Sequence, residues 1–236
     1  MLASPKQIIL ARTNGGVVIQ DNTCLTNRCV DVKLSLFMGV NSENKTVIFA
    51  QGFLSNEQNS LFDFANRFLL EICGGHPKHP IVCTTCCPLP HVIINDAGAA
   101  MTSPIAELMP HAKHLYCSWH ISKNLKRKCG GKTFADVVKR YTAESFATSM
   151  KAFERTWNQL KEVVKGTPCE GYINGYLYEG HWHAATMILG MRASQRVEAS
   201  FSAIKNGSAV RKHSTFCAVK KRVDTVAEDL AVASRM

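Results

Sequence analysis

The chain has 236 residues, 46% of them hydrophobic, which is enough for a packed core in one domain or one domain with an insertion. Its formal net charge of +10 favours polyanionic partners, nucleic acid above all, and its longest apolar stretches are far too short to span a bilayer. Residues 1–12 lack a signal-peptide pattern, so we expect an intracellular protein whose ten cysteines are reduced thiols or metal ligands.

The first half of the chain predicts a sheet. A β-branched run at residues 16–20 ends on Asp21. Two further apolar runs, at residues 30–40 and 46–54, are separated by a polar turn cluster at residues 41–45. Together these runs predict three strands in an antiparallel meander.

Helices and strands then alternate. Apolar residues at spacings of three and four predict an amphipathic helix over residues 61–72, which a Gly-Gly pair ends. The chain continues with a predicted buried strand that runs into Asp96, a short helix, a fifth strand and a basic helix, at residues 91–95, 103–109, 113–117 and 119–128. Helical patterns follow at residues 133–165, 194–205 and 216–233. In the first of them, apolar residues at spacings of three and four mark one face that we expect to pack as core: Phe146, Met150, Phe153, Trp157, Leu160 and Val164.

This order predicts an α/β fold with a mixed five-stranded sheet, flanking helices and an all-helical insertion before the last helix that carries a candidate acid. It is the order of ribonuclease H-like nucleotidyl transferases. We therefore expect residues 1–132 to form the first part of the core. Residues 133–190 form the insertion, and residues 191–236 hold the C-terminal catalytic helix and tail.

Acidic residues that follow strands are candidates for catalysis, because they project into a crevice at the end of the sheet. Carboxylates are the hard oxygen ligands that Mg²⁺ and Mn²⁺ prefer, and a pair of such ions can promote phosphoryl transfer. The chain has 18 acidic residues, so composition alone cannot say which three would form such a site.

Four blocks of sequence, in order, resemble the MULE (Mutator-like element) transposase domain. The first is DNTCLTNR at residues 21–28, followed by the strand pair of residues 34–57. The second is HVIINDAGAAM at residues 91–101, and the third is HLYCSWHISKNLKRK at residues 114–128. The last is GMRASQRVEASFSAIK at residues 190–205.

The resemblance implies a DDE triad of Asp21, Asp96 and Glu198 that holds Mg²⁺ or Mn²⁺ for DNA cleavage and strand transfer. Asp21 would bridge two ions, and each of the other acids would complete one of them. The same domain occurs in the far-red-response group of plant transcription factors, which derive from such transposases. The resemblance is therefore compatible with an active enzyme, or with a silent regulatory derivative or truncated copy. The intact triad favours the enzyme.

Cys117 and His120 match the C-x2-H signature of the third block. A structural zinc site needs four ligands. His114, Cys83 and either Cys86 or Cys87 are candidates to complete one, and the result would be a zinc-stabilised nucleic-acid-binding module. In the other interpretation Cys117 is buried, and His120 orients an active-site carboxylate or contacts DNA. The segment at residues 76–90, which holds the extra cysteines, has no counterpart in the family pattern.

Basic residues cluster near the third and fourth blocks and are candidates for DNA phosphate contacts. They are Lys123, Lys126, Arg127, Lys128, Arg196 and Lys205. The other interpretation of the clusters is a solvated helix face or a nuclear import signal. The resemblance implies a nuclear protein that binds transposon ends and target DNA and works as a homo-oligomer. No segment predicts a separate DNA-recognition domain, which favours the regulatory or truncated derivative.

Overall fold

The computed structural model describes residues 1–23, 32–74, 90–96, 98–129, 135–137, 139, 141, 149–176, 195–206 and 215–233. The chain divides into two compact units, which we call the sheet unit (residues 1–114 and 194–236) and the helical unit (residues 115–193). The domain boundaries predicted at residues 132 and 190 stay predictions. Among the described residues, no helix combines the length and apolar character that crossing a membrane requires.

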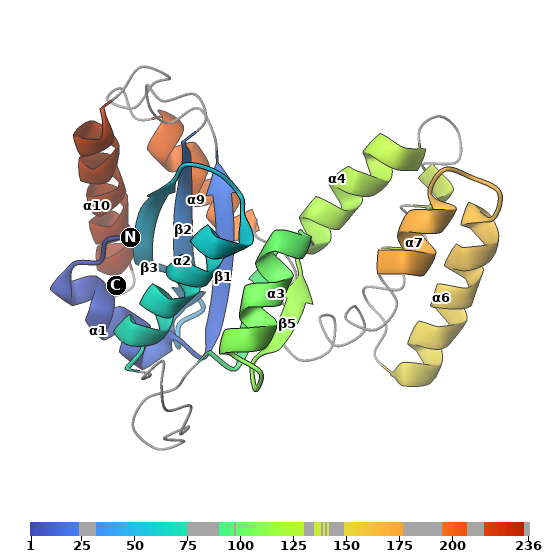
Figure 1. The fold of residues 1–236 in the computed structure, drawn as a ribbon, viewed down its shortest axis with the longest axis horizontal. Helices are drawn as coiled ribbons and strands as arrows, with labels where there is room; N and C mark the ends of the chain where they lie inside the picture. The colour runs from blue at the N-terminus through green and yellow to red at the C-terminus, as the bar shows by residue number, and fades with distance from the viewer. Residues whose placement is uncertain are drawn as a thin grey trace. The chain divides into compact units, whose positions relative to one another are not determined.

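A five-stranded mixed sheet forms the centre of the first unit, as the sequence predicts (Figure 1). Its strands are β1 (Val17–Thr23), β2 (Lys33–Val40), β3 (Thr46–Leu54), β4 (Val92–Asn95) and β5 (Lys113–Tyr116). They lie in the order β3-β2-β1-β4-β5. The first three strands form the predicted antiparallel meander, and β4 pairs with β1 in parallel.

Helices α1 (Pro5–Asn14), α2 (Asn59–Ile72) and α3 (Ala99–Leu108) cover one face of this sheet, which we call the α2 face. Val18 and Phe37 pack there against α1 and α2, and Ile93 packs there against Leu70 of α2 and Ile105 of α3. Because side chains alternate along a strand, every second residue points to the opposite face.

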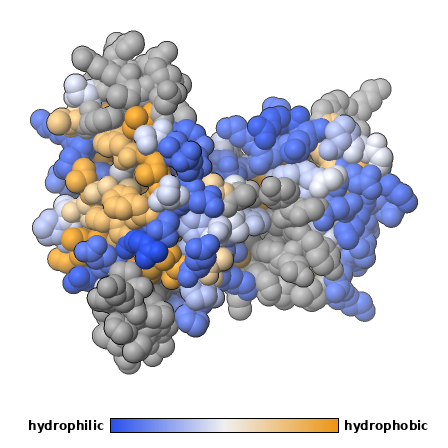
Figure 2. Space-filling view, viewed as in Figure 1, coloured by the Kyte–Doolittle hydropathy of each residue, from blue (hydrophilic) through white to orange (hydrophobic). Residues whose placement is uncertain are grey.

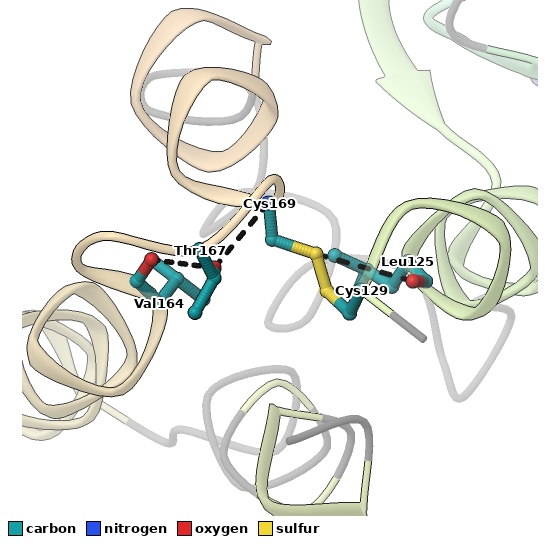
Figure 3. The surroundings of a disulfide bond; sticks show 5 residues. All are labelled: Leu125, Cys129, Val164, Thr167 and Cys169. Carbon is teal, nitrogen blue, oxygen red and sulfur yellow. Dashed lines mark hydrogen bonds between the residues drawn. A yellow bond between two sulfur atoms is a disulfide. The ribbon is translucent and has the colours of Figure 1, made fainter. Parts of the chain in front are cut away.

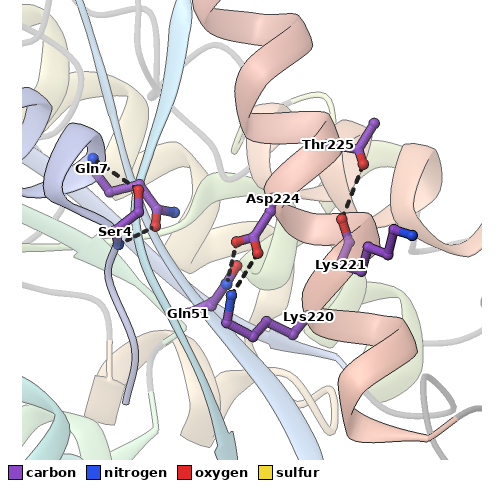
Figure 4. A network of polar contacts seen from close by, with 7 residues as sticks. All are labelled: Ser4, Gln7, Gln51, Lys220, Lys221, Asp224 and Thr225. Carbon is purple, nitrogen blue, oxygen red and sulfur yellow. Dashed lines mark hydrogen bonds and ion pairs between the residues drawn. The ribbon is translucent and has the colours of Figure 1, made fainter.

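That opposite face, which we call the α9 face, is contacted by α9 (Gln195–Asn206) and α10 (Phe216–Ala233). Gln51 of β3 donates a hydrogen bond from Nε2 to Oδ1 of Asp224 on α10 at 2.9 Å. The ammonium of Lys220 pairs with the other carboxylate oxygen of Asp224 at 2.6 Å (Figure 4). The packing of α10 on β3 thus includes a polar contact at the sheet surface.

Helix α1 was not among the predicted elements, although its start is encoded locally. Ser4 and Gln7 form a capping box, in which the Gln7 amide donates to Ser4 Oγ and the Ser4 amide donates to Gln7 Oε1 (Figure 4). Pro5 follows at the first helical position, where its missing N–H removes no helical hydrogen bond. This S-x-x-Q pattern is a signal for a helix start that the prediction did not use.

The helical unit contains α4 (Ser118–Cys129), α6 (Met150–Val164) and α7 (Glu170–Tyr176). Its core takes Ile121 and Leu125 from α4, and it takes the predicted apolar face of α6. The described members of that face are all buried: Phe153, Trp157, Leu160 and Val164. The prediction that this face is a packed core is therefore confirmed.

A disulfide joins Cys129, at the end of α4, to Cys169, just before α7, with 5.2 Å between the two Cα atoms (Figure 3). The Cys169 amide also donates to Thr167 Oγ1 at 3.3 Å. This bond differs from our expectation of reduced thiols or metal ligands. Spacing could not reveal it, because the two cysteines are 40 residues apart and meet only when α4 and α7 pack together. Cys73 and Cys117 are buried thiols, where sulfur packs like a small apolar group, whereas Cys217, for which apolar neighbours predict the same burial, is exposed.

Candidate active site

Asp21 lies inside β1, two residues before its end, and is only 4% exposed. It was predicted at the end of the strand, but β1 continues because Asn22 and Thr23 still pair with β2. Asp21 pairs with Leu36, which in turn pairs with Gln51. Since cross-strand partners share a face, Asp21 lies on the α9 face of the sheet. Its Oδ1 accepts a hydrogen bond from the Asn22 amide at 2.8 Å.

Asp96 follows β4 directly and is half-buried. In the parallel pair of β1 and β4, Ile19 is the partner of Ile94. Continuing this register by two residues places Asp96 beside Asp21. The two predicted acids are therefore neighbours at the end of the parallel pair, where the carboxyl ends of the strands meet. This is the edge at which α/β sheets bind ligands.

Glu198 lies on α9, whose backbone the structure describes, although its side chain is outside the described residues. Helix α9 contacts β1, and the Lys205 ammonium donates a hydrogen bond to Thr23 Oγ1. Seven residues separate Glu198 from Lys205, close to two full helical turns, so both positions share one face of α9. The three predicted acids thus come from two neighbouring strands and a helix that contacts one of them.

The donor set at this place suits a hard divalent cation, since carboxylate oxygens are the ligands that Mg²⁺ and Mn²⁺ take in proteins. Asp21 is buried, which limits the competition of bulk water for its oxygens. Within the described side chains, no three His, Cys, Asp or Glu residues form a group that could hold a metal ion. The third predicted carboxylate is that of Glu198, whose side chain is outside the described residues.

Cys117 and His120 lie at the start of α4 in the helical unit. Cys117 is fully buried, and the His120 ring packs edge-on against Trp119 with 4.8 Å between centroids. His114, the nearest candidate for a third zinc ligand, contacts Asn95 Oδ1 through Nε2 at 2.6 Å. That contact engages one of the two ring nitrogens that could bind zinc. Cys83, Cys86 and Cys87 are outside the described residues, so zinc binding stays a prediction.

Helix α4 presents the predicted basic cluster to solvent. Ile121, Leu125 and Cys129 recur every four residues on its buried side. The exposed side carries Lys123, Lys126, Arg127 and Lys128. None of these four forms an ion pair with a carboxylate of the described residues. Figure 2 shows hydrophilic side chains over this helix.

Aromatic rings hold two of these cations on α4. The Lys123 ammonium lies 4.3 Å from the centroid of the Trp119 ring, and that of Lys128 lies 5.4 Å from the Tyr172 ring. Of the other predicted DNA contacts, the Arg196 side chain is outside the described residues, and Lys205 is exposed but bonded to Thr23. A DNA backbone that approached α4 would therefore meet positive charges that no described carboxylate neutralises.

Two features of this site were missed from the sequence. One is the contact between Thr23 and Lys205, for which no local pattern exists. The other is the pair of amide side chains directly before the acids, Gln20 and Asn95, which are 0% and 1% exposed. Strand alternation could have placed both amides on the face opposite the acids.

Comparison with known proteins supports the resemblance found in the sequence. Residues 17–124 match the model of the MULE transposase domain. Three plant proteins from Arabidopsis thaliana are similar to the chain. Protein FAR1-RELATED SEQUENCE 5 is 29% identical over 165 residues, or 67% of this chain, and Protein FAR-RED IMPAIRED RESPONSE 1 is 25% identical over 125 residues, or 52%. Protein FAR1-RELATED SEQUENCE 4 is 28% identical over 134 residues, or 55%.

These alignments cover only 19%, 13% and 16% of the three relatives, so the chain spans a small part of each of them. The resemblance to the MULE transposase domain is confirmed over the matched residues. Asp21, Asp96, Cys117 and His120 lie inside the matched range, whereas Glu198 lies beyond it.

Proposed function

We propose that the sheet unit has a ribonuclease H-like fold and is the catalytic domain of a Mutator-like DDE transposase, which cleaves DNA and transfers strands with Mg²⁺ or Mn²⁺. The adjacency of Asp21 and Asp96 at the end of the parallel β1–β4 pair carries this proposal. Helix α9, which carries Glu198, supports it, because this helix packs against β1.

Divalent ions bound here would activate the attacking oxygen and stabilise the leaving one. Asp21 would hold both ions, while Asp96 and Glu198 would each hold one. In cleavage, water attacks the phosphorus, the bond to the 3′ oxygen breaks, and that oxygen leaves as a 3′ hydroxyl. In strand transfer this hydroxyl attacks a phosphodiester of target DNA and releases a 3′ hydroxyl from it. Neither step oxidises or reduces a group.

Exposed cations on α4 would hold the DNA backbone during these steps. Phosphate contacts of this kind position the duplex and carry no sequence information. Recognition of the transposon ends would therefore need other groups. The nuclear location and the homo-oligomeric state inferred from the family belong to this proposal as well.

A plasmid-nicking assay with Mn²⁺ or Mg²⁺ tests the enzyme directly. We expect wild-type protein to nick supercoiled DNA, and we expect Asp96→Asn to lose the activity while keeping its fold and its DNA binding. Asp63→Asn is the matched control, because it removes a partly buried carboxylate on α2 that pairs with Arg67. Nicking that survives in Asp96→Asn, or that needs no divalent ion, would reject the triad.

The second candidate is a domesticated DNA-binding or regulatory derivative that keeps the fold without turnover. The similarity to the two FAR1-RELATED SEQUENCE proteins and to FAR-RED IMPAIRED RESPONSE 1 favours it, as does the basic surface of α4, which binds phosphate whether or not catalysis follows. It predicts DNA binding by folded wild-type protein without nicking in either metal ion.

Both candidates require α4 to bind DNA, and a charge-matched pair of triple variants tests this. We expect replacement of Lys126, Arg127 and Lys128 by alanine to weaken binding and to lower the slope of log affinity against log salt by about 0.9 for each lost phosphate contact. The control replaces Lys151, Arg155 and Lys165, three exposed cations on or next to α6, and it should leave the slope unchanged. Equal losses in both variants would mean that α4 has no specific role.

A further inference from the structure

A layer of buried polar side chains lies on the α2 face, directly behind the two predicted acids. Gln20 precedes Asp21 and Asn95 precedes Asp96, so strand alternation turns both amides away from the α9 face. Continuing the β1–β4 register by one residue from Ile19 and Ile94 makes Gln20 and Asn95 neighbours.

His114 of β5 fixes one end of this layer. Its Nε2 lies 2.6 Å from Oδ1 of Asn95. Burial lowers the pKa of His114 to about 4, so the imidazole is neutral at pH 7 and carries one ring hydrogen. Because an amide oxygen only accepts, that hydrogen is on Nε2 and points at Asn95. The contact joins β5 to the last residue of β4.

Asn66 of α2 belongs to the same buried face. It is fully buried and lies one helical turn from Phe62 and from Leu70, which pack against α3 and the sheet. Both polar atoms of Asn66, both of Gln20 and Nδ2 of Asn95 have no hydrogen-bond partner among the described residues. Buried polar atoms of this kind weaken a fold, and apolar side chains of similar size would pack there more favourably.

Features that lower stability tend to occur where function requires them. Here they adjoin the two residues that carry the predicted carboxylates. We propose that Asn95 and His114 are positioning residues, which hold the end of β4 so that Asp96 presents its carboxylate beside that of Asp21 at one metal site. This inference rests on the proposed function, since it assigns these residues a role in the same site.

The action is indirect, through the backbone. The His114–Asn95 contact restrains Asn95, and the next peptide unit leads to Asp96. A shift of one strand against the other would change the separation of the two carboxylates. Divalent ions of this class bind at narrow ligand distances, so affinity should report such a shift.

Isothermal titration of the full chain with Mn²⁺ tests the inference. We expect His114→Phe, which keeps the ring and removes the donor, to weaken Mn²⁺ binding about tenfold, as is typical of changes in the outer shell of a metal site. His114→Gln restores a donor at a similar place and should regain most of the affinity. Asn95→Leu should weaken binding as much as His114→Phe, and the double variant should be no worse than either.

Two controls separate positioning from a general loosening of the fold. Ser35→Ala removes another buried and unpartnered polar atom from the same face, on β2, which carries no predicted acid. Ile105→Val enlarges the space beneath Ile93 without changing a polar group. Both should keep wild-type affinity, and circular dichroism should show every variant folded at the titration temperature.

The outcomes also distinguish this inference from the proposed function. If wild type binds Mn²⁺, Asp21→Asn abolishes binding and His114→Phe binds like wild type, the metal site stands and the positioning role is wrong. The positioning role is equally wrong if His114→Gln does not recover affinity, or if Ser35→Ala binds as weakly as His114→Phe. If wild type binds no Mn²⁺, or if wild type and Asp21→Asn bind Mn²⁺ with the same affinity, the proposed metal site is wrong. The inference is then wrong as well.

Discussion

The ammonium of Lys205 donates a hydrogen bond to the hydroxyl of Thr23, although 182 residues separate the two in sequence. Thr23 ends β1 two residues after Asp21, and Lys205 is near the end of α9, seven residues after Glu198. The contact therefore ties the strand that carries one predicted acid to the helix that carries another. Lys205 was predicted to contact DNA, and its observed partner gives it a structural role besides.

We expect this contact to contribute energy that depends on both partners. Lys205→Met and Thr23→Val each remove one side of the bond while keeping similar bulk. In a double-mutant cycle of urea denaturation the coupling should be about 1 kcal/mol, the usual net value for a protein hydrogen bond. Simple additivity of the two substitutions would show that the bond contributes nothing to the docking of α9.

Asp21 should lower the stability of the protein without metal and raise it when Mn²⁺ is bound. Two neighbouring carboxylates without a cation repel each other, and Asp21 is also buried. We expect Asp21→Asn to raise the free energy of unfolding in EDTA by about 1 kcal/mol. With Mn²⁺ at a hundred times its Kd, wild type should gain about 2.7 kcal/mol, and Asp21→Asn should not. Thermal melts with and without Mn²⁺ measure both values, and Asp63→Asn is the control. Equal Mn²⁺ shifts in wild type and Asp21→Asn would contradict a site at Asp21.

Acid should destabilise the protein through His114. Burial lowers the pKa of this histidine from 6.5 to about 4, so between these values the unfolded chain binds a proton that the folded chain does not. The free energy of unfolding therefore keeps its full value above pH 6.5. It falls as the pH drops towards 4, by roughly 3 kcal/mol in total for a shift of this size. Urea denaturation at pH 7 and pH 5 measures the loss. The loss should be smaller in His114→Gln, and an identical loss in that variant would place the acid sensitivity elsewhere.

The Cys129–Cys169 disulfide should stabilise the helical unit alone. It closes a loop of 40 residues, for which loop-closure entropy gives about 4 kcal/mol. All three tryptophans, at positions 119, 157 and 182, lie in residues 115–193, so their fluorescence reports this unit. We expect dithiothreitol or Cys169→Ala to lower the urea midpoint seen by fluorescence. Cys217→Ala, at the exposed free thiol of α10, should leave it unchanged. Coincident midpoints with and without reductant would show that the bond adds no stability.

Much of the architecture could be predicted because its signals are local. The apolar and β-branched runs of β1 to β3, the apolar period of α2 and the apolar face of α6 each predict their element from neighbouring residues. The MULE resemblance likewise depends on short blocks of sequence. Helix α1 was missed although Ser4 and Gln7 encode its cap, so the signal was present and was not used.

The sequence by itself determined the strands of the meander, the buried strand before Asp96 and the basic exposed side of α4, because each follows from hydrophobic pattern and charge within one segment. Only the tertiary structure decided that Asp21 neighbours Asp96, that Lys205 meets Thr23, that His114 contacts Asn95 and that Cys129 pairs with Cys169. The physical reason is that each of these relationships depends on strand register or on helix docking. Both are set by packing energies summed over many residues far apart in the chain.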